Sequence, residues 1–165
     1  MRVYLLRHGE RQNSRSLAGP SDPGLSARGL RQAQAIAAKV ESGEWDKPDR
    51  ILCSPKIRSQ HTLAPLSLQS SCSLQILPSL DERTSEETAP QFTIRVRKLL
   101  YDLESLPGVN YLCSHHDWIE EAMISIPSST ELLNSQYHIW EPGSFMIFDL
   151  VDGIWELRKA GGIQA

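Results

Sequence analysis

The stretch Arg2-Val3-Tyr4-Leu5-Leu6-Arg7-His8-Gly9-Glu10 decides the fold class. Its apolar run, Val3 to Leu6, is too short for a helix and predicts a buried strand. The polar residues that begin at Arg7 predict that the strand ends there in a loop. A buried strand followed by a loop and a helix is typical of the α/β class.

The same alternation continues along the chain. Short strands are predicted at 51–53, 74–77 and 109–113. Helices are predicted to begin at Ser26, with Leu25 and Leu30 as a hydrophobic staple, at Ser54-Pro55, at Pro90 and after Asp117. Asp152-Gly153, between apolar runs, predicts a β-hairpin with a type I′ turn. The expected fold is a three-layer α/β/α sandwich with a mainly parallel sheet and a C-terminal antiparallel hairpin.

Length and composition limit the classes of protein. The 165 residues are 40% hydrophobic and 22% charged, which predicts one globular domain spanning 1–165. The net charge of −3 argues against general nucleic-acid or membrane binding. No apolar run reaches the roughly 18 residues of a membrane span. Cys53, Cys72 and Cys113 form neither a disulfide framework nor a zinc motif, so we expect a cytoplasmic protein. The sequence does not determine the oligomeric state.

Charge is unevenly distributed along the chain. Residues 1–58 hold 11 of the 17 Lys and Arg but 6 of the 20 acids, a net charge of +5, and the remainder carries −8. A positive segment in an acidic protein can hold a small anion. Chance clustering on a solvated face is the alternative.

Polar residues gather where the predicted strands end. Arg7-His8 follows the first strand, Ser54 to Arg58 the second and His115 the fourth, while Glu82 lies shortly after the third. Ligands of such sheets bind beyond the carboxyl ends of the strands, so these residues are expected to share one site. Arginine forks match phosphate oxygens, a neutral imidazole can act as a nucleophile, and a carboxylic acid can protonate a leaving oxygen. The set therefore favours phosphoryl transfer.

Several segments together resemble the histidine phosphatase superfamily, also called phosphoglycerate mutase-like. The RHGE signature at the end of the first strand is similar to Arg7-His8-Gly9-Glu10. Further segments that resemble family elements, in family order, are Asp22–Ala33, Cys53–Thr62, Leu80-Asp81-Glu82-Arg83, Glu87-Thr88 with Arg95-Val96, and Ser114-His115. The chain departs from the family pattern at His116, where glycine is common, and at Asn13, which lies one place short of a frequent asparagine.

The resemblance implies a two-step mechanism with neither metal nor cofactor. His8 would become phosphorylated while Arg7, Arg58 and His115 hold the phosphoryl group. Glu82 would act as the acid that protonates the leaving group. Four further residues are candidates for rim or substrate contacts: Gly9, Asn13, Arg83 and His116.

Other functions remain open at this stage. A mutase of the same fold would return the phosphate to a small metabolite, and a scaffold would bind phosphate without turnover. A metal hydrolase built on His8, His115, His116 and Asp117 lacks a ligand spacing that supports it.

The substrate class depends on what covers the site. Only 33 residues separate Glu82 from His115, and a predicted helix and strand use most of them, so no large lid insertion is expected. An open site resembles the compact SixA-type phosphohistidine phosphatases and favours a phosphorylated protein. Glu82 points the other way, because it resembles the acid of branches that act on small phosphomonoesters. Of the two, the sequence favours a phosphorylated protein.

Overall fold

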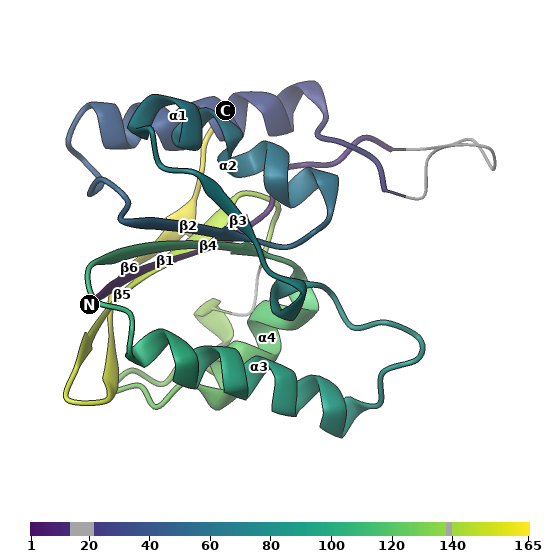
Figure 1. Cartoon of the computed structure of the whole chain (residues 1–165), viewed down its shortest axis with the longest axis vertical. Helices are drawn as coiled ribbons and strands as arrows, with labels where there is room; N and C mark the ends of the chain where they lie inside the picture. Colours follow the sequence, from purple (N-terminus) through teal and green to yellow (C-terminus); the bar gives the residue numbers. More distant parts are fainter. Residues whose placement is uncertain (14–21, 138–139) are drawn as a thin grey trace.

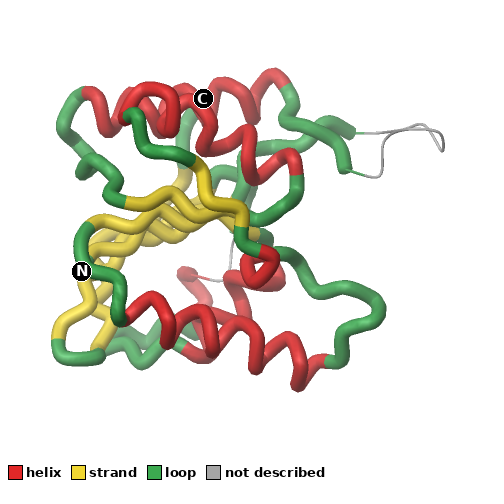
Figure 2. Tube along the Cα trace, in the orientation of Figure 1, coloured by secondary structure: helices red, strands yellow, loops and turns green. Residues whose placement is uncertain are grey.

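The computed structural model describes residues 1–13, 22–137 and 140–165, and these form one sheet between two helical layers (Figures 1 and 2). The strands are β1 (Arg2–Arg7), β2 (Arg50–Cys53), β3 (Leu74–Ile76), β4 (Val109–Ser114), β5 (Ser144–Val151) and β6 (Ile154–Gly162). The helices are α1 (Ala27–Glu41), α2 (Ile57–Ser70), α3 (Ala89–Glu104) and α4 (His116–Ser125), with 3₁₀ turns η1 (Pro78–Leu80) and η2 (Ser135–Tyr137).

The sheet has the order β3-β2-β4-β1-β5-β6. The pairs β3–β2, β2–β4 and β4–β1 are parallel, whereas β1–β5 and β5–β6 are antiparallel. Helices α1 and α2 cover one face, and α3 and α4 cover the other (Figure 1). This arrangement confirms the predicted three-layer α/β/α sandwich with a mainly parallel sheet and a C-terminal hairpin.

Strand β1 packs against both helical layers. Val3 and Leu5 belong to the core beneath α3 and α4, and Tyr4 and Leu6 belong to the core beneath α1 and α2. This explains the uninterrupted apolar run, because a strand covered on both faces has no solvent side for polar residues. Burying each such large side chain contributes about 1.5–3 kcal/mol.

The register of the central strands brings their carboxyl ends to one edge. Arg7 of β1 lies opposite Ser114 of β4, and Cys53 of β2 lies opposite Cys113 of β4. The residues that follow these positions are His8, Ser54 and His115. The predicted convergence of the strand ends is therefore a direct consequence of the pairing.

Helix α1 begins as predicted, but Leu30 is not part of its buried face. The Ser26 hydroxyl accepts a hydrogen bond from the Gly29 backbone N–H at 3.1 Å, which makes Ser26 the N-cap. Leu25 is buried, whereas Leu30 is 52% exposed. The predicted staple between them is wrong, because the buried face of α1 consists of Gly29, Gln32, Ala33, Ile36, Ala37 and Val40.

Helix α2 begins at Ile57, later than the predicted start at Ser54-Pro55. The Ser54 hydroxyl contacts His115 and Asp81 rather than capping the helix. The Asp22 carboxylate takes over part of that role by accepting a hydrogen bond from the Ile57 backbone N–H at 2.7 Å.

The C-terminal hairpin has the predicted turn. Asp152 and Gly153 have φ angles of 51° and 78°, and a type I′ turn requires positive φ at both central residues. In the described part of the chain, the helices lack the combination of length and apolar character that crossing a membrane requires.

Candidate active site

Arg58 lies between the two candidate histidines. His8 follows β1, His115 follows β4, and their ring centroids are 5.2 Å apart. Arg58 in the first turn of α2 donates from Nε to His8 Nε2 at 3.3 Å and from Nη2 to His115 Nδ1 at 3.2 Å. The structure therefore brings these three sequence-predicted residues into one cluster.

The arginine contacts determine where each imidazole carries its proton. A guanidinium group only donates, so the nitrogen atoms that face Arg58 are acceptors. His8 then carries its proton on Nδ1, which donates to the Gly9 carbonyl oxygen at 2.8 Å. His115 carries its proton on Nε2, which donates to the Ser54 hydroxyl oxygen at 2.7 Å. His8 Nε2 is therefore unprotonated, and its lone pair accepts the hydrogen bond from Arg58.

Burial keeps both imidazoles neutral. It lowers the pKa of His8 to about 4, with further lowering by the Arg58 and Arg7 charges and a partly offsetting hydrogen bond to Gly9. Burial and then the Arg58 charge lower the pKa of His115 to about 2. A neutral ring is the form that can act as a nucleophile.

The candidate acid, Glu82, pairs with the buried arginine. Glu82 Oε2 lies 2.9 Å from Arg58 Nη2, and Glu82 Oε1 lies 3.6 Å from Lys56 Nζ. Asp22 Oδ1 accepts from Arg58 Nη1 at 3.1 Å. Arg58 is only 4% exposed, whereas the Glu82 side chain is 40% exposed. Glu82 is thus the partner that can move towards solvent or substrate.

Arg7 has a donor that lacks a partner. Its Nη1 donates to the Trp140 carbonyl oxygen, but its buried Nε has no hydrogen-bond partner in the described residues. Burial lowers the pKa of Arg7, because the charged guanidinium loses solvation. An unpaired buried donor on a cation costs free energy that a bound anion would recover.

The loop that carries Glu82 is anchored from α3. Arg95 forms two hydrogen bonds of 2.7 Å with the Glu87 carboxylate. The same guanidinium donates to the carbonyl oxygens of Asp81 at 2.9 Å and Glu82 at 3.3 Å. The predicted Glu87–Arg95 spacing therefore corresponds to an ion pair that holds the acid loop.

Replacing Arg95 by methionine should free this loop. We expect a loss of about 2 kcal/mol in the free energy of unfolding, because a paired carboxylate and several carbonyl oxygens lose their donor. Urea unfolding measures the loss. Lys98→Met, which removes an exposed cation of the same helix, is the matched control. Equal stability of the two variants would contradict the anchoring role.

A cavity of about 390 Å³ opens over this cluster. Its lining consists of Arg7, His8, Glu10, Arg11, Asn13, Arg58, Glu82, His116, Asp117 and Pro142. Of the four predicted rim residues, Asn13 and His116 line the cavity and the other two do not. The predicted phosphate-binding residue His115 is buried beside Arg58 and is not part of the lining. Arg83 turns away and donates from Nε to the Glu87 carbonyl oxygen at 3.0 Å.

Gly9 contributes to the site through its backbone. Its N–H donates to Thr62 Oγ1 at 2.9 Å, and its carbonyl oxygen accepts from His8. Helix α1 approaches this loop so closely that a Cβ on Gly29 would collide with the Glu10 carbonyl oxygen. The loop after β1 is therefore packed against α1 and α2.

Sequence analysis missed several members of the site. Arg11, Glu10 and Pro142 line the cavity, and Asp22 holds Arg58. The RHGE and Asp22–Ala33 segments contained Glu10 and Asp22 but gave no indication of their contacts. Pro142 lies far from the other residues in sequence, and no local pattern could have placed it there.

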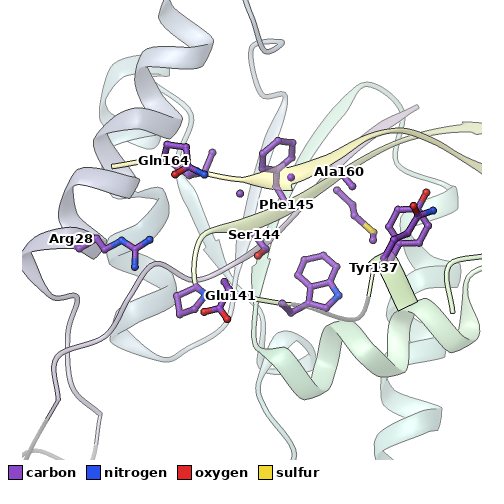
Figure 3. A pocket seen from close by; sticks show the side chains of 14 residues that line it. Arg28, Tyr137, Glu141, Ser144, Phe145, Ala160 and Gln164 are labelled. Atoms are coloured by element: carbon purple, nitrogen blue, oxygen red, sulfur yellow. The ribbon is translucent and has the colours of Figure 1, made fainter. Parts of the chain in front are cut away.

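A second cavity of about 420 Å³ adjoins the first at Pro142 (Figure 3). Arg28 from α1, Glu141, and Phe145 from β5 lie around it. None of the predicted site residues lines this cavity. The candidate chemistry therefore belongs to the cavity over Arg58.

The metal-hydrolase alternative required a cluster of ligands. In the described ranges, no three His, Cys, Asp or Glu side chains gather as a metal site would require. Cys53, Cys72 and Cys113 are all free.

The two neutral histidines predict a pH dependence of stability. Unfolded histidine titrates at about 6.5, above both folded values, so the unfolded chain binds more protons in between. The free energy of unfolding should therefore fall as the pH falls below about 6.5, by about 2 kcal/mol per ring at pH 5. Urea unfolding at several pH values measures this slope.

Two variants assign the slope to these rings. His115→Asn should reduce the slope by about half, because His8 remains, whereas replacing the exposed His61 by asparagine should leave it unchanged. A His115→Asn protein with the wild-type slope would refute the assignment.

Comparisons with known proteins identify the family and the fold of the chain. A family model described as "Histidine phosphatase superfamily (branch 1)" matches residues 3–87. The adenosylcobalamin/alpha-ribazole phosphatase of Escherichia coli (strain K12) is 37% identical over 84 residues, which are 50% of this chain and 40% of that relative. The matched region thus spans less than half of the relative's length.

Solved structures extend the likeness to nearly the whole chain. The alpha-ribazole phosphatase from Shigella flexneri has a TM-score of 0.72 at 23% identity, with 97% of this chain and 96% of that chain covered. The protein histidine phosphatase SixA, complexed with tungstate, has a TM-score of 0.73 at 17% identity, with 98% and 97% covered. These likenesses show a shared fold. The family model covers more than half of the chain, and the chain therefore belongs to the histidine phosphatase superfamily.

Proposed function

We propose that this chain is a phosphatase that works through a phosphohistidine intermediate on His8. The observation that carries the proposal is the unprotonated His8 Nε2, which accepts from Arg58 and lines one cavity with Arg58 and Arg7. In this proposal the two arginines hold a phosphoryl group in that cavity, and His8 Nε2 attacks its phosphorus. Positioning and charge stabilisation are the main contributions that proteins make to phosphoryl transfer.

The first step transfers the phosphoryl group to the protein. His8 Nε2 forms a bond to phosphorus while the bond from phosphorus to the leaving oxygen breaks, and the electron pair stays on that oxygen. Glu82, in its protonated form, gives its proton to the oxygen. Arg7 and Arg58 balance the charge on the equatorial oxygens.

The second step releases phosphate. A water molecule gives a proton to the Glu82 carboxylate and forms a bond to phosphorus, while the phosphorus–nitrogen bond breaks. His8 regains its electron pair and Glu82 its proton, so the site is ready for another cycle. The nucleophile, the acid and the cations of these steps are all side chains of this protein.

The site favours a small phosphomonoester as substrate. Glu82 lines the cavity, and an acid in this position assists the departure of an alkoxide. The cavity volume of about 390 Å³ lies within the range of small-molecule sites. The similarity to adenosylcobalamin/alpha-ribazole phosphatase also supports a small phosphorylated metabolite.

A protein phosphohistidine is the second candidate. The interval between Glu82 and His115 contains a loop, α3 and β4, and α3 packs on a face of the sheet rather than over the cavity. The substrate entrance is therefore free of an inserted lid from this interval. The structural likeness to SixA makes a phosphoprotein substrate worth testing.

Phosphate release from p-nitrophenyl phosphate in the presence of EDTA tests the reaction itself. The proposal predicts turnover that EDTA leaves unchanged, with free phosphate as product. A mutase returns the phosphate to a substrate molecule, so accumulation of free phosphate favours a phosphatase over a mutase. If no phosphate is released at all, a phosphate-binding scaffold is favoured.

A competition experiment then separates the substrates. The ratio kcat/KM is measured for a phosphohistidine protein, phosphosugars and nucleotides. We expect a small phosphomonoester to have the highest value, and the highest value for the phosphoprotein would overturn that choice.

A further inference from the structure

His115 belongs to a second set of contacts on the side away from Arg58. Its Nε2 lies 2.7 Å from Ser54 Oγ, and Ser54 Oγ lies 3.3 Å from Asp81 Oδ1. Asp81 Oδ1 is also 3.6 Å from His115 Nε2. The three residues come from the ends of β4 and β2 and from the loop after η1, and both Ser54 and His115 are buried.

The donors and acceptors of this set follow from the arginine contact. Because Arg58 donates to His115 Nδ1, the ring proton is on Nε2 and donates to Ser54 Oγ. The Lys56 backbone N–H donates to the same oxygen at 3.2 Å. The remaining hydroxyl proton of Ser54 donates to Asp81 Oδ1. The hydrogen bonds thus form one directed chain that ends at a carboxylate.

The set has the residue types of a Ser-His-Asp triad but a different order. In a triad the acid binds the imidazole nitrogen that faces away from the serine. Here Asp81 binds the serine hydroxyl, and Ser54 is fully buried. A substrate cannot reach this hydroxyl, so it does not act as a nucleophile.

The direction of these hydrogen bonds limits how His115 can hold phosphate. A neutral ring with its proton on Nε2 presents an electron pair at Nδ1, which accepts from Arg58 but repels a phosphate oxygen. To donate to phosphate from Nδ1 while keeping the bond to Ser54, the ring must carry both protons. A carboxylate behind Ser54 stabilises that charged form.

We propose that Ser54 and Asp81 are positioning residues that orient His115 and stabilise its doubly protonated form when phosphate binds. The inference rests on the proposed function, because it takes the cavity over Arg58 to be a phosphate site. Neither residue touches the phosphate, since each acts through His115.

The charges around His115 agree with a second protonation of its ring that occurs only when phosphate binds. Arg58 and Lys56 from α2 and Arg7 from β1 oppose a charge on the ring, and the neutral His8 adds none. Asp81 and Glu82 from the loop favour it, but Arg58 and Lys56 partly neutralise Glu82, and Lys56 Nζ also lies 3.8 Å from Asp81 Oδ2. A bound dianion adds the negative charge that shifts this balance.

Nitrogen-15 NMR of the histidine rings in the intact chain tests the proposal. Long-range correlation spectra report which ring nitrogens carry protons. Inorganic sulfate is the probe, because it is a tetrahedral dianion without a titratable proton near neutral pH. The spectra are recorded with and without sulfate for the wild type, Ser54→Ala, Asp81→Asn and Glu86→Gln. Glu86→Gln removes an exposed acid of the same loop and is the matched control.

The expected result has three parts. In the wild type without sulfate, His115 has its proton on Nε2 alone. When sulfate binds, Nδ1 takes up a second proton from solvent. Asp81→Asn weakens sulfate binding roughly tenfold, because a fall of about one unit in the His115 pKa makes the charged ring tenfold less favourable. Glu86→Gln leaves sulfate binding unchanged. Ser54→Ala also weakens sulfate binding, because the link from His115 to Asp81 is lost, while Arg58 keeps the proton of the sulfate-free ring on Nε2.

Any of three results would overturn the proposal: a wild-type ring with its proton on Nδ1, a ring that stays neutral with sulfate bound, or equal behaviour of Asp81→Asn and Glu86→Gln. The wild-type spectra alone can overturn the proposal even if a variant fails to fold. The spectra do not depend on turnover. An inactive protein with the expected spectra would refute the proposed function and leave the role of Ser54 and Asp81 intact.

Discussion

Replacing His8 by alanine is expected to abolish turnover. The variant loses the nitrogen that forms the phosphoenzyme, and loss of a covalent nucleophile lowers kcat/KM by roughly a thousandfold or more. The fold should persist, because the lost side-chain contacts are two hydrogen bonds, with the adjacent Gly9 carbonyl oxygen and with Arg58 Nε, and neither joins residues of the hydrophobic core. His8 is 5% exposed, so the deletion also leaves a small cavity that costs about 1–2 kcal/mol.

Steady-state kinetics and urea unfolding of the same preparation separate the two effects. His61→Ala, which removes an exposed imidazole from α2, is the control and should keep wild-type kinetics. A folded His8→Ala protein that turned over at the wild-type rate would rule out His8 as the nucleophile.

Replacing Glu82 by glutamine should have an effect that depends on the leaving group. A sugar alkoxide needs a proton in the transition state, so kcat/KM for a phosphosugar should fall by about 10²–10⁴. p-Nitrophenolate leaves without that help, so kcat/KM for p-nitrophenyl phosphate should fall by less than about tenfold. Loss of the ion pair with Arg58 also frees that arginine for phosphate, so KM for both substrates should not rise.

The ratio of the two losses is the informative quantity. It is measured on both substrates for Glu82→Gln and for Glu86→Gln, an exposed acid of the same loop that should leave both values unchanged. Equal losses for the two substrates in Glu82→Gln would mean that Glu82 does not donate the proton.

Local patterns in the sequence predicted most of the architecture. The buried strand β1, the Ser26 cap and the Asp152-Gly153 turn depend on residues close in sequence, and the structure confirms each of them. The convergence of Arg7, Arg58 and His115 also followed from the sequence, because parallel strands end at one edge of the sheet.

The errors arose where a distant contact replaced a local one. Ser54-Pro55 has the pattern of a helix start, but His115 and Asp81 occupy the serine hydroxyl, so α2 begins at Ile57. Leu30 fits a staple by spacing alone, yet it faces solvent. The Asp22 contact with Arg58 and the turn of Arg83 towards Glu87 depend on tertiary packing, which spacing does not encode.

Trapping of the phosphoenzyme tests the central claim most directly. The chain is mixed with a phosphorus-32-labelled phosphomonoester, quenched within one turnover in alkaline denaturant, digested and mapped. The account predicts label that is stable to base and labile to acid, on the peptide that contains His8, with or without EDTA. Turnover without labelled protein, or label on a residue other than His8, would contradict it.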